Sequence, residues 1–214
     1  MIDGWTNIAA RAKAKVKAYH HNDLPGALIR EALKALSKTC EADFTLRSLA
    51  RRIGVSHAAP YAHFPTKTAL LAAIASAGFE AAHARLRAAS AAAAAGGPRG
   101  QLVAASRAAV QWGLENPALY RLMFGAELGA DSYSYPKLKA ASHAAYETLL
   151  AHVRALRPGD DGKGAWAAWS MVHGLTMLLL DNRIGHGGSI EDESAIRSVL
   201  EIVVAGIEAR PAGN

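Results

Sequence analysis

The feature that most limits how this chain can fold is Gly54, a glycine between two short helical patterns. Before it, apolar residues recur at helical spacing and give one short helix an apolar face, namely Leu46, Leu49, Ala50 and Ile53. A glycine directly after the last apolar position is typical of a helix that ends on a left-handed residue, because glycine adopts that conformation without a Cβ clash. The pattern predicts a helix, a tight turn and a second helix.

The second helix is predicted from His57 to Phe64, with Ser56 as its N-cap and Thr45 as the N-cap of the helix before it. Pro60 falls near the first turn, where most backbone amides lack an intrahelical partner, so its cost is far below the roughly 3 kcal/mol of a mid-helix proline. We expect Phe64 to return to the core. Such a helix-turn-helix places its second helix in the major groove of DNA.

Basic residues gather in the same part of the chain. Residues 1–80 hold eleven Lys/Arg against six Asp/Glu, whereas residues 81–214 hold thirteen against twelve. A polyanion partner requires such a concentration of positive charge, although charge alone is equally compatible with a solvated basic face. Thr66 and Lys67 then open another helix, whose amino terminus is an expected anion site.

An ordered string of residues over about 24–80 resembles the TetR family of transcriptional regulators. The string is Leu49-Ala50, Gly54-Val55-Ser56, Tyr61-Ala62-His63-Phe64, Pro65, Lys67 and Leu70-Leu71. The resemblance implies an N-terminal three-helix DNA-binding domain that contacts a double-stranded operator. By position, the implied DNA contacts are Thr45, Arg47, Ser56, His57, Ala58, Tyr61, His63 and Lys67.

The composition favours an all-α protein, because alanine is abundant and β-branched runs are few. Cys40 is the single cysteine and cannot form an internal disulfide, so we expect a reducing, cytoplasmic setting. The most apolar run, Ala165 to Leu180, is interrupted by polar residues and is shorter than the roughly 20 residues of a membrane span. We expect no secretory leader and no membrane partner.

Three segments are predicted along the chain. Residues 1–22 form a basic arm, which either contacts DNA or is a disordered leader, and the adjacent His20 and His21 lack further ligands for a zinc site. Residues 23–80 form the DNA-binding domain, beginning with a helix that Asp23 caps and that runs to about Lys38. Residues 81–214 form an effector-binding and dimerisation domain, and a break is expected at or before Gly96-Gly97-Pro98.

Turn-forming residues divide the carboxy-terminal part into further helices. Asn116 is the expected N-cap of a helix with Pro117 at its first position, and Ser189 is the expected cap of the last helix. The expected helices are Gln101–Glu115, Ala118–Leu128, Lys137–Leu156, Ala165–Ile184 and Ile190–Ala209.

The Ala165–Ile184 helix is apolar nearly all round and must be covered on every side. Pairing with a second copy through the last two helices supplies that cover, so we expect a homodimer. The segment Trp169 to Gly174 also resembles a TetR subgroup named after its tryptophan, histidine and glycine motif, which implies an effector-binding and dimerising bundle.

A small apolar or amphipathic effector is expected inside this bundle, because large apolar side chains with a few polar tips are typical of small-molecule sites. Each residue taken singly also fits an ordinary core. The candidates are Trp112, Tyr120, Met123, Phe124, Tyr146, Trp169, His173 and Met177.

The alternative functions are an enzyme, a helical ligand-binding or interaction module without specific DNA binding, and a nonspecific DNA binder. The chain has no glycine-rich phosphate loop, no His-Glu pair at metal-binding spacing and no nucleophile elbow. We therefore expect a DNA-binding regulator, acting as a repressor on a palindromic operator, with no catalytic residues, no metal and no cofactor.

Overall fold

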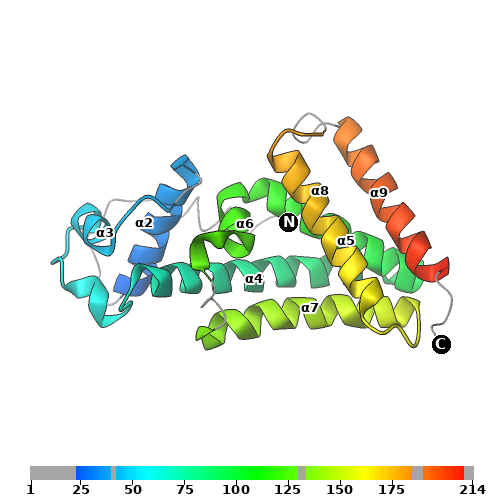
Figure 1. Cartoon of the computed structure of the whole chain (residues 1–214), viewed down its shortest axis with the longest axis horizontal. Helices are drawn as coiled ribbons and strands as arrows, with labels where there is room; N and C mark the ends of the chain where they lie inside the picture. Colours follow the sequence, from blue (N-terminus) through cyan, green and yellow to red (C-terminus); the bar gives the residue numbers. More distant parts are fainter. Residues whose placement is uncertain (1–22, 40–41, 130–133, 185–189, 210–214) are drawn as a thin grey trace.

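The computed structural model describes residues 23–39, 42–129, 134–184 and 190–209, and these are almost entirely helical. Figure 1 shows a head of short helices, α2 and α3, at one end of a bundle of longer helices. The predicted all-α fold is confirmed over the described residues. Among those residues, no helix is long and apolar enough to cross a lipid bilayer.

The first helix of the head begins where the sequence predicts. α2 (Leu24–Thr39) follows Asp23, whose carboxylate accepts a hydrogen bond from the Gly26 amide at 3.1 Å. The same carboxylate pairs with Arg30 at 3.1 Å. Asp23 therefore acts as the predicted cap and also supports the second turn of the helix.

The next helix, α3 (Leu46–Ile53), is fixed at both ends by local hydrogen bonds. The Thr45 hydroxyl accepts from the Ser48 amide, and the Ser48 hydroxyl accepts from the Thr45 amide. This reciprocal pair satisfies two amides that would otherwise lack partners. Gly54 then has a left-handed φ of 76°, as predicted, and ends the helix.

The prediction of a second α-helix after Gly54 is wrong. Instead of an α-helix from His57 to Phe64, the chain forms a 3-10 turn, η1 (Ala59–Ala62). Three amides in this segment donate to the carbonyl three residues earlier. Because Pro60 has no N–H, it cannot donate to the carbonyl four residues back, and the tighter three-residue spacing takes over. Pro60 and Phe64 are buried and attach the turn to the head.

The longest helix, α4 (Lys67–Ala92), joins the head to the bundle. It begins at the predicted place, and Thr66 is its N-cap, whose hydroxyl accepts from the Ala69 amide at 3.0 Å. Leu70, Leu71 and Ile74 are buried in a core that also contains residues of α2, α3 and the later helices α5 and α6. The head and the first part of the bundle thus share one continuous core.

The described residues form five further helices of the bundle, and α7 lies alongside α4 (Figure 1). They are α5 (Gly97–Glu115), α6 (Pro117–Phe124), α7 (Pro136–Leu156), α8 (Lys163–Leu180) and α9 (Ile190–Ala209). The predicted N-cap Ser189 lies outside the described residues.

Several predicted helix ends are shifted. α5 begins at Gly97 instead of Gln101, because Pro98 falls in the first turn, where its missing amide has no intrahelical partner to lose. Asn116 is the N-cap of α6 and Pro117 is its first residue, as predicted, but the Asn116 side chain does not cap the helix, since its amide group donates to the Trp112 carbonyl at 2.9 Å. α6 stops at Phe124 instead of Leu128, and the extended Gly125 follows it.

The limits of α8 also differ from the predicted Ala165–Ile184. Its start moves to Lys163 because the Asp160 carboxylate accepts from the amides of Gly162 and Gly164. Its end moves to Leu180 because Asn182 adopts a positive φ of 52°, which stops the helical path.

The outer surface of α8 and α9 carries large apolar side chains. Trp166 and Leu178 on α8 are 62% and 45% exposed, and Ile202 on α9 is 71% exposed. Cβ atoms added at Gly174 and Gly206 would meet nothing within 4 Å. A single copy of the chain therefore leaves part of this predicted apolar surface uncovered.

Candidate nucleic-acid interface and internal cavity

Seven of the eight residues predicted to contact DNA lie exposed on the head. The buried Pro60 and Phe64 hold η1 against the core, so the side chains between and before them face solvent, and Tyr61 is 44% exposed. The exposed set is Thr45, Arg47, Ser56, His57, Ala58, Tyr61 and His63. The structure brings them to one end of the molecule, and their contact with DNA stays a prediction.

Lys67 differs from the other seven because it is partly buried and engaged. Its ammonium group donates to the Ala42 carbonyl and lies 5.3 Å from the centre of the Phe44 ring. These contacts connect the loop before α3 to the first turn of α4. A phosphate contact by Lys67 therefore competes with a hydrogen bond inside the protein.

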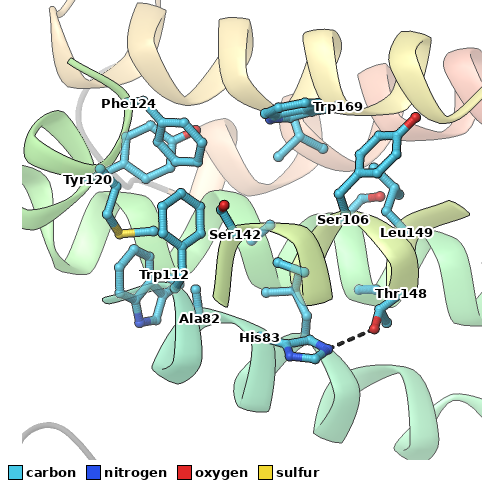
Figure 2. Close-up of a pocket in the computed structure, with 18 of the residues that line it drawn as sticks. Ala82, His83, Ser106, Trp112, Tyr120, Phe124, Ser142, Thr148, Leu149 and Trp169 are labelled. Atoms are coloured by element: carbon cyan, nitrogen blue, oxygen red, sulfur yellow. Dashed lines mark hydrogen bonds between the residues drawn. The ribbon is translucent and has the colours of Figure 1, made fainter. Parts of the chain in front are cut away.

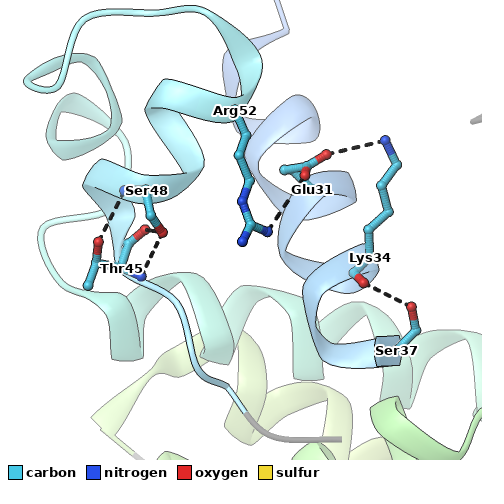
Figure 3. A network of polar contacts seen from close by, with 6 residues as sticks. All are labelled: Glu31, Lys34, Ser37, Thr45, Ser48 and Arg52. Carbon is cyan, nitrogen blue, oxygen red and sulfur yellow. Dashed lines mark hydrogen bonds and ion pairs between the residues drawn. The ribbon is translucent and has the colours of Figure 1, made fainter. Parts of the chain in front are cut away.

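The arginines of α3 fall into two classes. Arg52 lies 3.9 Å from Glu31 of α2, which also pairs with Lys34 at 3.2 Å (Figure 3). Arg47 and Arg51 are exposed and form no ion pair within the described part of the chain. Their charge is available to an external anion. The prediction missed Arg51, although its place four residues after Arg47 puts both on the same helix face.

A cavity of about 120 Å³ lies inside the bundle, between α4, α5, α6, α7 and α8. Its walls are mostly aromatic and aliphatic, and alanines on three helices leave the space open. Figure 2 shows the side chains that face it. The lining residues are Phe79, Ala82, His83, Leu86, Ala105, Ser106, Ala109, Trp112, Tyr120, Met123, Phe124, Ser142, Ala145, Tyr146, Thr148, Leu149, His152, Trp169 and Val172.

Six of the eight predicted pocket residues line this cavity: Trp112, Tyr120, Met123, Phe124, Tyr146 and Trp169. His173 and Met177 do not line it. His173 lies behind Tyr120, with its Nδ1 3.0 Å from the tyrosine hydroxyl, and burial lowers the pKa of this imidazole. Burial also raises the pKa of Tyr120 to about 12, so the hydroxyl stays protonated. Met177 packs against the shared core.

Sequence reasoning missed the polar residues that α4 and α7 bring to the cavity. His83 Nε2 lies 2.7 Å from the Thr148 hydroxyl (Figure 2). Burial and the neighbouring Arg87 lower the pKa of His83, which favours the neutral imidazole. The sequence offers little indication of this pair, because a single histidine on the alanine-rich α4 does not reveal which residue of another helix it contacts.

A second pair, between His152 of α7 and Ser90 of α4, lies beside the first, and its geometry indicates which atoms carry the protons. His152 Nδ1 lies 2.7 Å from the Thr148 carbonyl, which can only accept, so Nδ1 must donate. In the neutral ring Nε2 then accepts, and the Ser90 hydroxyl at 2.5 Å donates to it. Two histidine–hydroxyl pairs thus connect α4 to α7.

Two polar groups of the cavity wall lack partners within the described part of the chain. The hydroxyl of Ser106 forms no hydrogen bond there, although the residue is only 5% exposed. The Trp112 indole N–H is buried and also unsatisfied among these residues. The Ser106 hydroxyl faces the cavity and is a place where a bound molecule could form a hydrogen bond, whereas the indole N–H is too fully covered to meet one.

The cavity wall contains no lysine, arginine, aspartate or glutamate among its described residues. The described residues also include no group of three His, Cys, Asp or Glu placed to hold a metal ion. The chemistry that this wall offers is apolar contact, aromatic stacking and hydrogen bonding.

Two family models match the chain. Residues 28–74 match the model for bacterial regulatory proteins of the tetR family, and residues 102–202 match the tetracyclin repressor-like C-terminal domain. No curated protein matches the sequence.

Solved structures resemble the fold over most of the chain. A protein of unknown function from Rhodococcus sp. RHA1 is 28% identical, with a TM-score of 0.76, and the match covers 89% of this chain and 98% of that one. A TetR family transcriptional regulator, PfmR from Thermus thermophilus, is 22% identical, with a TM-score of 0.60, over 83% of this chain and 97% of that one. At that identity, the second likeness shows the fold alone.

Proposed function

Since the chain belongs to the TetR family of transcriptional regulators and is a DNA-binding regulator, we propose that it represses transcription by binding a palindromic operator as a homodimer. A small molecule in the cavity releases it. In this proposal residues 23–80 are the DNA-binding domain, and residues 81–214 bind the effector and form the dimer.

The observation that carries the proposal is the exposed η1 segment. Burial of Pro60 and Phe64 fixes the turn, which leaves His57, Ala58 and Tyr61 free to meet a groove. The Ala58 methyl suits contact with a thymine methyl, whereas Tyr61 suits phosphate contact. The exposed arginines of α3 add positive charge beside this segment.

The dimer is proposed to form through α8 and α9. Trp166, Leu178 and Ile202 are exposed apolar side chains that a second copy would cover, and the open sides of Gly174 and Gly206 allow close approach of helices. A two-fold dimer presents two heads to the DNA. Their spacing must match about 34 Å, one helical repeat of the duplex, for both to bind.

Release by an effector is proposed to run through α4 and α6. α4 carries head-core residues such as Leu71 and cavity residues such as His83 on one continuous helix. Met123 of α6 lines the cavity and touches α4 at Gly78, where an added Cβ would lie 2.6 Å from its sulfur. A ligand that displaces α6 or α4 therefore changes the support of the head, and it favours release if it binds the displaced state more tightly.

Specific binding is tested by gel shift with the duplex upstream of the protein's own coding sequence. We expect a discrete, salt-sensitive complex that survives competition by random DNA at equal concentration. Loss of the complex to random DNA would favour a nonspecific binder instead.

The dimer is tested by Ile202→Glu, which places a charge on the proposed interface. We expect the variant to sediment as a monomer and to bind the upstream duplex at least about tenfold more weakly. Arg154→Glu, an exposed substitution on α7, is the control. Unchanged sedimentation of the Ile202 variant would exclude this surface as the interface.

A further inference from the structure

We infer that the cavity takes an uncharged, single-ring apolar molecule with one hydroxyl or carbonyl group, which forms a hydrogen bond with Ser106. The inference rests on the proposed function only in naming this molecule as the effector. The cavity itself, its charge and its unpartnered hydroxyl are properties of the bundle alone.

The volume sets the size of the molecule. The cavity measures about 120 Å³, and an apolar cavity of about 150 Å³ in another protein binds benzene. A single substituted ring therefore fits with small adjustments of the walls.

The walls set the chemical class. Trp112, Tyr120, Phe124, Tyr146 and Trp169 provide aromatic surface on several sides, and such surfaces stack on or contact a ring edge. The described wall contains no side chain with a permanent charge. A carboxylate inside would lose its hydration without gaining a cation, so anions are disfavoured.

The free hydroxyl sets the position of the polar group. Other hydroxyls of the wall have partners: Ser142 donates to the Lys139 carbonyl at 3.1 Å, and Thr148 pairs with His83. Ser106 has none among the described residues and is nearly buried. The Tyr146 hydroxyl is also unpartnered within the described residues, but its side chain is only half buried and water can reach it.

Ser106 lies at one end of the cavity, and the aromatic rings of Tyr120 and Phe124 lie at the other. Figure 2 shows it on the side of Leu149, whereas Tyr120 and Phe124 lie at the opposite side of the view. The cavity therefore has a more aromatic end and an end with a free hydrogen-bonding group. A molecule with a polar group on one side of an apolar ring matches this polarity.

The test compares three probes of similar size, phenol, benzene and benzoate, by calorimetric titration at pH 7.5. We expect phenol to bind about fivefold more tightly than benzene, because it gains one hydrogen bond. Benzoate should bind at least about tenfold more weakly than phenol, because its charge must be desolvated. Benzoate binding as tightly as phenol, or no binding of phenol, would overturn the inference.

Ser106→Ala isolates the anchor. We expect this variant to bind phenol and benzene about equally well, because the hydrogen bond that favours phenol is gone. The matched control is Ser142→Ala, which removes a cavity hydroxyl that is already engaged, and it should keep the fivefold preference. If Ser106→Ala retains the preference, Ser106 is not the anchor and the inference fails; if that variant does not fold, the benzoate comparison on the unmodified protein decides.

The same probes separate this inference from the proposed function. Phenol binding with the expected selectivity in a protein that binds no specific duplex would contradict the proposed function and support the cavity assignment. Specific duplex binding in a protein that ignores phenol would contradict the cavity assignment alone.

Discussion

The head and the bundle place their polar side chains in opposite ways. In the head, apolar residues such as Leu49 and Phe64 are buried, and the polar side chains of α3 and η1 face solvent. In the bundle, His83, Ser106 and Thr148 face an internal cavity instead. One region thus offers charge and hydrogen bonds to a large external partner, and the other offers hydrogen bonds and apolar contact to a small molecule that leaves water.

This difference has a consequence for how each region responds to salt and charge. Contacts between exposed arginines and phosphates weaken as salt rises, because counterions compete for both partners. Binding in an uncharged cavity depends on apolar burial and fixed hydrogen bonds, which salt screens little. Substitutions can therefore change one activity without the other.

The largest effect is expected from Arg47→Ala combined with Arg51→Ala. A dimer then loses four exposed positive charges, and affinity for the upstream duplex should fall on the order of 100-fold at 150 mM salt. The measurement is fluorescence anisotropy at several salt concentrations, where the salt slope should also decrease. Phenol binding should not change.

The control for the double variant is Arg154→Ala, which removes an exposed charge from α7. It should leave DNA affinity and the salt slope nearly unchanged. Equal losses in the control and in the double variant would mean that net charge, and not the surface of α3, governs DNA binding.

A smaller effect is expected from Lys67→Ala, which leaves the buried Ala42 carbonyl without its donor. The free energy of unfolding should fall by about 1–2 kcal/mol, as measured by urea denaturation. The salt slope of DNA binding then decides the second role of this lysine. A decrease supports the predicted phosphate contact, whereas an unchanged slope removes Lys67 from the DNA-contact set.

The smallest effect concerns pH and the cavity histidine His83. Its pKa is lower in the folded protein than in the unfolded chain, so protons favour unfolding. Its contribution to stability is present above the unfolded pKa of about 6.5 and is lost as pH falls below it. His173 has a pKa shift in the same direction and acts the same way.

His83→Gln tests this effect because glutamine can still form a hydrogen bond with Thr148 but does not titrate. Between pH 7.5 and pH 5.5, the variant should lose less unfolding free energy than the unmodified protein. Urea denaturation at both pH values measures the loss. The same loss in both proteins would show that His83 does not contribute to the pH dependence.

Comparison of sequence and structure shows which features follow local rules. The caps at Asp23 and Thr45 and the turn at Gly54 depend on neighbours within a few residues, and the sequence predicted all three. The η1 turn was mispredicted as an α-helix, because the balance between three- and four-residue hydrogen bonding around Pro60 also depends on how Pro60 and Phe64 are buried.

The cavity could be predicted only in part, because its shape depends on how distant helices cross. Large aromatic residues such as Trp112 and Tyr146 were predicted from their size and spacing. Ala82, Ala105 and Ala145 were not, although their small side chains leave the space that those aromatic residues surround. The pairing of His83 with Thr148 joins residues 65 positions apart, and no local sequence pattern predicts it.

The most direct test of the central claim is hydroxyl-radical footprinting on a duplex that the protein binds. Two heads that each insert an exposed η1 segment should protect two patches, related by two-fold symmetry and centred about 34 Å apart, and Tyr61→Ala should weaken both patches equally. A single protected patch, or uniform protection along the duplex, would contradict the account.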